Sequence, residues 1–95
     1  MAAIVGVCTL DLHIPEATSL KSKRSVLKSM LDGIRDRFHV SAAEVEYLDL
    51  WQRAGIAIAC VSNSQAYTNE VLDKVVNWVE ANPRVFVTRV ELEFL

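Results

Sequence analysis

The order in which the hydrophobic pattern changes along the chain is the strongest constraint on its fold. Two segments place their apolar residues on one side of a helix, and four runs rich in apolar and β-branched residues have the character of strands. Pro15 closes the first run, and Asn82 and Pro83 end the second helical segment. The expected strands are residues 3–12, 40–48, 54–62 and 85–94, and the expected helices are residues 20–38 and a segment from a cap within 62–64 to about residue 81.

This β-α-β-β-α-β order predicts an α+β fold, the ferredoxin-like sandwich. Two right-handed crossovers place both helices on one face of a four-stranded antiparallel sheet. The chain has 95 residues, of which 52% are hydrophobic, and this length and composition are typical of one core. We therefore expect residues 1–95 to form a single domain.

The other face of the sheet, here called the helix-free face, is expected to expose small apolar side chains. Such a surface usually marks an interface, and homodimerisation through it is one use. RNA recognition by this face is disfavoured, because the first and third strands carry no aromatic residue for base stacking. The residues expected on it are Val5, Val7, Ala57, Ala59, Val61, Val85 and Val87, whereas Phe86, Val90, Leu92 and Phe94 are expected to share the opposite face of the last strand.

Positive charge is expected to gather at one end of the sheet, although the chain is acidic overall. Ten Lys and Arg residues against twelve Asp and Glu residues give a net charge of −2, which excludes a wholly basic nucleic-acid coat but not a local patch. The predicted topology brings the start of the first helix and the turn between the second and third strands together, near His13. The predicted anion- or RNA-binding residues, here called the basic rim, are Ser19, Lys21, Lys23, Arg24, Trp51, Gln52, Arg53 and Arg84.

Cations at the start of the first helix are unusual. Lys21, Lys23 and Arg24 lie near its N-terminus, where an exposed cation is unfavourable by roughly 0.3–1 kcal/mol because the helix dipole is positive there. A bound phosphate would make the same arrangement favourable. The alternative is a solvated positive surface that is balanced by nearby carboxylates.

Trp51 is a second unusual feature, because it lies in an expected turn. Beside Gln52 and Arg53 it is placed to stack on a base or on a partner's side chain. The alternative is that Trp51 folds back over the end of the core next to Leu50, as large aromatic residues often do in small domains.

The sequence predicts neither a catalytic residue nor a cofactor. Asp11, His13 and Glu16 match no metal-ligand spacing, and one histidine is too few for zinc. Cys8 and Cys60 are expected to be reduced core residues with no histidine beside them. An enzyme for a small phosphorylated substrate, similar to acylphosphatases, has the anion site in its favour. It lacks a glycine-rich phosphate loop with the required Arg and Asn, and a paired acid and base.

The N-terminal segment is apolar but does not resemble a signal peptide. It lacks a basic start, and Asp11 closes it without a cleavage site of small residues. Nowhere does an apolar stretch approach the ~18–20 residues of a membrane span. We expect a cytoplasmic protein with no membrane partner.

Three segments of the sequence, LHIP, SLKSKRSVLKS and DLWQRAGIA, resemble the YlxP-like family of small bacterial proteins, classed as domain of unknown function 503. The resemblance extends over nearly the whole chain. It implies a ferredoxin-like fold and no established catalytic activity. Its members are often labelled RNA-binding, because their genes commonly lie beside those for translation initiation and ribosome maturation. The family's basic segment falls on residues 19–25, and its hairpin motif falls on residues 49–53.

The leading hypothesis is a non-enzymatic module that binds ribosomal RNA or a ribosome assembly intermediate through the basic rim. A protein-interaction or dimerisation module that acts through the helix-free face is the alternative. An enzyme for a small phosphorylated ligand is the third hypothesis.

Overall fold

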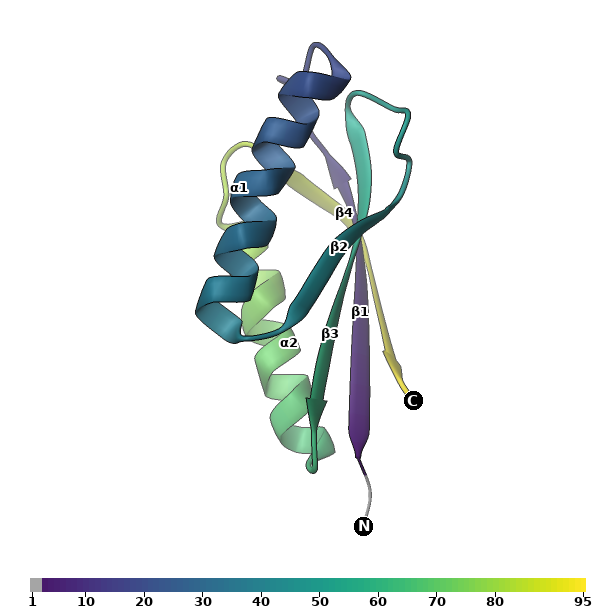
Figure 1. The fold of residues 1–95 in the computed structure, drawn as a ribbon, viewed down its shortest axis with the longest axis vertical. Helices are drawn as coiled ribbons and strands as arrows, with labels where there is room; N and C mark the ends of the chain where they lie inside the picture. Colours follow the sequence, from purple (N-terminus) through teal and green to yellow (C-terminus); the bar gives the residue numbers. More distant parts are fainter. Residues whose placement is uncertain (1–2) are drawn as a thin grey trace.

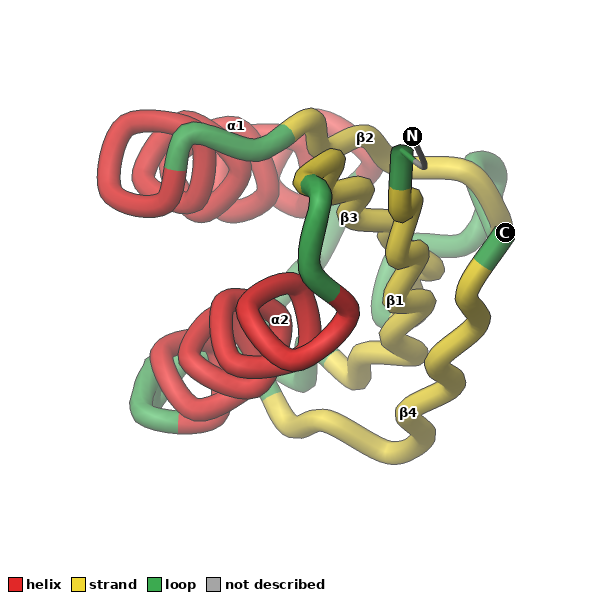
Figure 2. The backbone as a smooth tube through the Cα atoms, turned by 90° about the horizontal axis from the view of Figure 1, so that it is seen from below, coloured by secondary structure: helices red, strands yellow, loops and turns green. Residues whose placement is uncertain are grey.

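The computed structural model describes residues 3–95, and it confirms the predicted α+β, ferredoxin-like fold (Figure 1). All neighbouring strands are antiparallel, and their order in the sheet is β2-β3-β1-β4. Both helices lie on one side of the sheet (Figure 2). The elements are β1 (Ile4–His13), α1 (Leu20–Phe38), β2 (Ser41–Glu46), β3 (Arg53–Ser62), α2 (Gln65–Glu80) and β4 (Phe86–Phe94).

The core lies between the helices and the two central strands. Leu10 and Leu12 of β1 and Ile56 of β3 are fully buried, and they alternate with residues that face the other side of the sheet. Apolar stripes on the two helices cover them. Burying one such side chain contributes about 1.5–3 kcal/mol, so this layer is the main source of stability.

The helix boundaries follow local signals. Ser19 and Ser22 form a reciprocal capping box at the start of α1, and Ser64 caps α2 by accepting the N–H of Tyr67. The first helix ends where His39 adopts a left-handed conformation, with φ 54°, that no longer continues the helix. Along residues 3–95, neither helix is long and apolar enough to cross a bilayer.

The predicted alternation of the last strand is wrong at its start. The register with β1 shifts at Thr88, where one extra residue forms a bulge. Because a bulge reverses the alternation, Phe86 lies on the helix-free face opposite His13. Val85 is 3% exposed, and Val87 packs against the core, so neither belongs to the helix-free face as the sequence pattern predicts.

The helix-free face is therefore only partly apolar. Its lower part carries half-buried valine and alanine side chains of β1 and β3 and the exposed Val61. Its upper part is polar, with a hollow of about 180 Å³ whose lining includes Asp11, Arg89 and Glu91. The continuous apolar surface expected from the sequence is divided by charge.

Candidate nucleic-acid interface

One end of the sheet brings together the β1–α1 loop, the start of α1 and the β2–β3 hairpin, as the topology predicts (Figure 1). Gln52 joins the hairpin to the loop. Its side-chain Nε2 donates to the carbonyl oxygens of Pro15 and Ala17 at 3.1 and 3.2 Å. Its own carbonyl oxygen accepts the N–H of Ile14 at 2.9 Å and lies 3.1 Å from Nδ1 of His13. Gln52 is thus engaged in holding the hairpin in place.

Lys23 does not face solvent, and the prediction that it contacts a phosphate there is wrong. Its side chain is 0% exposed, and Nζ donates to the carbonyl oxygens of Tyr47 at 2.9 Å and Arg53 at 3.2 Å. Oε2 of Glu44 lies 2.9 Å from the same nitrogen as its ion-pair partner. The ammonium group is neutralised inside the protein, so it fastens α1 to the hairpin instead of adding to the surface charge.

Serine hydroxyls occupy part of the helix start. Ser22 Oγ accepts the backbone N–H groups of Thr18 and Ser19 and donates to the Ser19 carbonyl oxygen, while Ser19 Oγ accepts the N–H of Ser22. The N–H groups of the first helical residues, Leu20 and Lys21, have no carbonyl partner within the helix. These two N–H groups remain for an anion, fewer than an uncapped helix would offer.

Lys21 and Arg24 are the cations of the basic rim that remain free. Both side chains are exposed, and within residues 3–95 neither forms an ion pair. The first turn of α1 contains no acidic residue. These two charges therefore add to the positive end of the helix dipole instead of balancing it.

Two further arginines of the basic rim are paired at the surface. Arg53 Nη2 lies 3.2 Å from Oδ2 of Asp11 and donates to the Tyr47 hydroxyl at 2.9 Å, and its guanidinium lies over the Tyr47 ring. Arg84 Nε donates to Oε1 of Glu16 at 2.5 Å. The side chains of both arginines are about half exposed, at 50% and 53%. Glu16 is equally exposed, and such an exposed pair is worth only about 0–1 kcal/mol, so an external phosphate can compete for Arg84. Asp11 is only 13% exposed, so Arg53 is held more firmly.

Trp51 is 55% exposed, so it does not fold back over the end of the core. It lies in the β2–β3 hairpin beside Leu50, which is 47% exposed. Together with His13, Gln52 and Arg53, these two side chains line an open hollow of about 530 Å³. The hairpin thus presents an aromatic ring to solvent.

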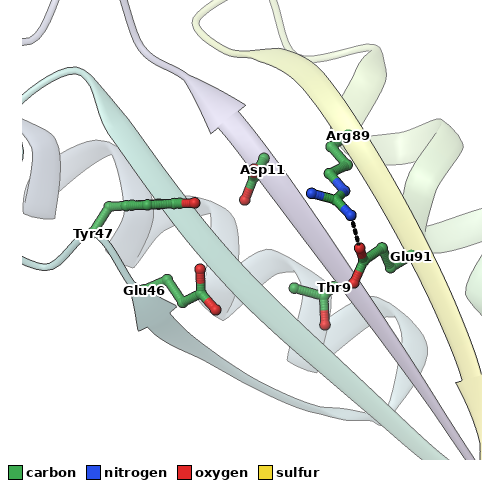
Figure 3. A pocket seen from close by; sticks show the side chains of 6 residues that line it. All are labelled: Thr9, Asp11, Glu46, Tyr47, Arg89 and Glu91. Atoms are coloured by element: carbon green, nitrogen blue, oxygen red, sulfur yellow. Dashed lines mark ion pairs between the residues drawn. The ribbon is translucent and has the colours of Figure 1, made fainter.

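A polar hollow on the helix-free face lies outside the residues predicted from the sequence. Figure 3 shows the guanidinium of Arg89 turned towards Glu91, with Asp11, Glu46 and Tyr47 around the same hollow. The alternation of polar residues in the first and last strands indicates part of this cluster, but the contribution of the hairpin depends on a chain reversal. Among residues 3–95, no three His, Cys, Asp or Glu side chains are arranged to hold a metal ion.

Tyr47 has an unusual backbone conformation at the base of the hairpin. Its φ is 59°, in the left-handed region that a bulky residue seldom adopts. The carbonyl of this residue accepts Lys23 Nζ, and its ring packs under Arg53. The buried lysine and the surface arginine thus hold a turn that local sequence preferences do not favour.

Both cysteines are free and buried, as predicted. Burial raises the pKa of the Cys8 thiol from 9.0 to about 11, and the negative charge of Asp73 adds to this effect. The thiol is therefore protonated at neutral pH, which is the opposite of an activated nucleophile.

These observations define a small α+β protein of the ferredoxin-like type with an exposed, partly basic hairpin end. The chain belongs to the family described as protein of unknown function (DUF503), which matches residues 5–92. It is also similar to "Uncharacterized protein YlxP" of Bacillus subtilis (strain 168), with 37% identity over 90 residues that cover 93% of this chain and 98% of that protein. The family resemblance predicted from the sequence is confirmed.

Proposed function

We propose that this protein is a non-enzymatic RNA-binding module whose partner is ribosomal RNA or a ribosome assembly intermediate. The observation that carries the proposal is the exposed ring of Trp51, on a hairpin that Lys23 fastens to the start of α1. The free cations Lys21 and Arg24 lie at that helix start. An exposed aromatic ring at the same end of the molecule as unpaired cations supports this proposal, because proteins bind unstacked bases by stacking and their phosphates with cations.

Each part of the surface has a separate task in this proposal. Trp51 stacks on one base of a single-stranded loop, which is worth about 1–3 kcal/mol. Lys21 and Arg24 contact the adjoining phosphates, because neither has to give up a carboxylate partner first. Arg84 can exchange its exposed carboxylate partner for phosphate at small cost. Arg53 keeps its mostly buried partner Asp11 and can meet a phosphate with the exposed part of its guanidinium.

The burial of Lys23 lowers the number of phosphate contacts that the surface can make. Ser19 and Gln52 act mainly in shaping it, since both already form hydrogen bonds within the protein. The exposed cations of the basic rim are Lys21, Arg24, Arg53 and Arg84. With one phosphate for each, the logarithm of the affinity should fall with the logarithm of salt at a slope of roughly −3 to −4.

Fluorescence anisotropy with labelled fragments of small-subunit ribosomal RNA, at two salt concentrations, tests the proposal. Lys21→Glu/Arg24→Glu should abolish salt-dependent binding, and Trp51→Ala should weaken it about tenfold or more. The matched control is Lys28→Glu/Lys74→Glu, which makes the same change in net charge at exposed lysines away from the hairpin. Binding that does not respond to salt, or that the control variant loses equally, would overturn the proposal.

The alternative function is a protein-interaction or dimerisation module that acts through the helix-free face. The apolar surface available for such an interaction is smaller than the sequence predicts, because Val85 and Val87 lie on the core side and charged residues share the helix-free face. The apolar part that remains centres on Val61, which is 67% exposed. Val61→Lys should therefore abolish any association that uses this surface.

A further inference from the structure

The two edges of the sheet differ in how they are protected. At the β2 edge, Arg35 Nη2 donates to the outward carbonyl oxygen of Ala42 at 2.6 Å, and Glu44 is engaged by the buried Lys23. The other edge is β4, which is nine residues long and lies away from α1 (Figure 2). Beyond the bulge at Thr88, β4 continues as a regular edge strand from Arg89 to Phe94, and a regular edge strand is a template for pairing with another strand.

The backbone of β4 presents regularly spaced hydrogen-bonding groups at this edge. The N–H of Leu95 donates to the carbonyl oxygen of Val5 at 2.8 Å, which identifies the residues that bond to β1. Hydrogen-bonding direction alternates along an antiparallel strand, so the intervening residues point away from β1. The N–H and C=O groups of Val90, Leu92 and Phe94 are therefore directed outwards.

The side chains of β4 give this edge two different faces. On the helix side, Val90 and Leu92 are 48% and 42% exposed, so α2 covers the outer strand only in part. On the helix-free face, Arg89 and Glu91 stand two residues apart with opposite charges, and both are more than half exposed. The edge thus combines an apolar row with a charge pair.

We propose that the β4 edge binds the same strand of a second copy of this chain. The two strands run antiparallel about a two-fold axis at Val90, so that the four-stranded sheet continues into eight strands. In this register Arg89 lies opposite the partner subunit's Glu91, and symmetry repeats the pair. Val90 of each copy packs against the partner's Val90 on the helix side of the sheet.

Charge complementarity selects this register. An axis at Glu91 would place two glutamates directly opposite each other, and an axis at Leu92 would place Glu91 opposite the partner's Glu93. Like charges that face each other across strands are destabilising. In the single chain Arg89 pairs with its own Glu91. Exposed pairs of this kind exchange partners at little cost.

Sedimentation equilibrium of the full chain up to about 1 mM, a range in which even a weak contact is populated, measures the association. Arg89→Glu alone and Glu91→Arg alone should each raise the dissociation constant about tenfold or more, since each replaces two attractive pairs with two repulsive ones. An equimolar mixture of the two variants should form a heterodimer. The double variant Arg89→Glu/Glu91→Arg should restore the homodimer.

Two controls separate this contact from a general effect of charge or folding. Glu93→Arg makes the same charge change as Glu91→Arg on the same face but lies beyond the Arg89–Glu91 pairs, where the bulge at Thr88 turns Val87 to the helix side, so association should be almost unaffected. Val90→Pro removes an outward N–H at the centre of the contact without removing a bond to β1, and should leave a folded monomer. Circular dichroism checks the folding of each variant, and the charge-exchange mixture tests the proposal even if the proline variant fails to fold.

A protein that stays monomeric throughout this range would overturn the proposal. A dimer whose dissociation constant changes with neither Arg89→Glu nor Glu91→Arg would also overturn it. Association lost with Val61→Lys but kept with Arg89→Glu would place the contact on the helix-free face instead. The proposal does not depend on RNA binding. Trp51→Ala should leave the dissociation constant of the dimer unchanged.

Discussion

The starts of α1 and α2 have the same construction but bury different side chains. Each helix follows a serine cap in extended conformation, and in each the fourth residue is fully buried: Lys23 in α1 and Thr68 in α2. The Thr68 hydroxyl reaches Ser62 Oγ at the end of β3, at 2.7 Å. Lys23 reaches across to the hairpin, where it meets two carbonyl oxygens and a carboxylate.

The difference shows what each helix start has to hold. Thr68 ties α2 to the strand that directly precedes it, so a short hydroxyl side chain is sufficient. Lys23 ties α1 to a hairpin that follows it in the chain by about two dozen residues, and that connection requires a long side chain with several donors. The contact at the start of α1 thus contains a buried charge, whereas the contact at the start of α2 joins two neutral hydroxyl groups.

The largest effect should come from removing the buried charge. Lys23→Met keeps the apolar stem but leaves Glu44 without its ion-pair partner and the carbonyl oxygens of Tyr47 and Arg53 without their donor. Breaking a buried pair in this way should lower the free energy of unfolding by about 3–5 kcal/mol, measured by urea titration. Lys23→Met/Glu44→Leu should recover most of the loss. A single variant as stable as the parent would show that the two helix starts do not differ energetically.

Alkaline pH should reveal the contribution of a buried group that is neutral at pH 7, the thiol of Cys8 in the middle of β1. Because the pKa of Cys8 is raised from 9.0 to about 11, this thiol stabilises the fold fully below pH 9, and the contribution is lost as the pH rises towards 11. The loss should reach about 2–3 kcal/mol beyond that of Cys8→Ala over the same range. Urea titrations of both proteins at pH 8 and 11 measure it. If the free energy of unfolding of both proteins falls by the same amount between pH 8 and 11, the Cys8 thiol does not contribute to the pH dependence.

Thr68→Val should have a smaller effect than Lys23→Met. The substitution keeps the shape of the side chain and removes its hydrogen bond to Ser62, which still donates to the carbonyl oxygen of Ser64. We expect a loss of about 1 kcal/mol, the usual value for one neutral hydrogen bond. Thermal unfolding, monitored by circular dichroism, measures this loss. A decrease in the free energy of unfolding as large as that of Lys23→Met would show that the two helix starts do not differ in this way.

The smallest difference should separate the two caps themselves. Ser19 belongs to a reciprocal box with Ser22, whereas Ser64 accepts one N–H from Tyr67 at 3.2 Å. Ser19→Ala should therefore destabilise the protein by about 1–2 kcal/mol and Ser64→Ala by about 0.5–1 kcal/mol. Chemical denaturation of both variants tests this order, and Ser→Gly at each site is the control for backbone flexibility. The reverse order would contradict the account of the two starts.

The sequence predicted the strands and helices well, because their signals are local. The alternation of Leu10 and Leu12 in β1 and the apolar stripe of α1 follow from the spacing of apolar residues along the sequence. The bulge at Thr88 could not be predicted in this way, because it exists only in the pairing of β4 with β1. One inserted residue there reversed the expected side of Phe86, Val85 and Val87.

The candidate site was predicted less completely than the fold. Lys21 and Arg24 lie at the exposed helix start, as expected, and the hairpin lies at the same end of the molecule. Charge patterning alone could not separate these cations from Lys23, because three neighbouring cations on one helix look alike in sequence. The unusual conformation of Tyr47 likewise has no glycine or asparagine to signal it.

The sequence by itself determined the order of elements, the approximate start of each helix and the buried face of the central strands, since each depends on interactions between residues close in the chain. Only the tertiary structure decided which cation is buried and which aromatic ring is exposed. The direction of Lys23 depends on hairpin carbonyls some two dozen residues away, and the exposure of Trp51 depends on how Gln52 ties the hairpin to the β1–α1 loop. Those partners become neighbours only when the sheet forms, so no pattern along the chain contains them.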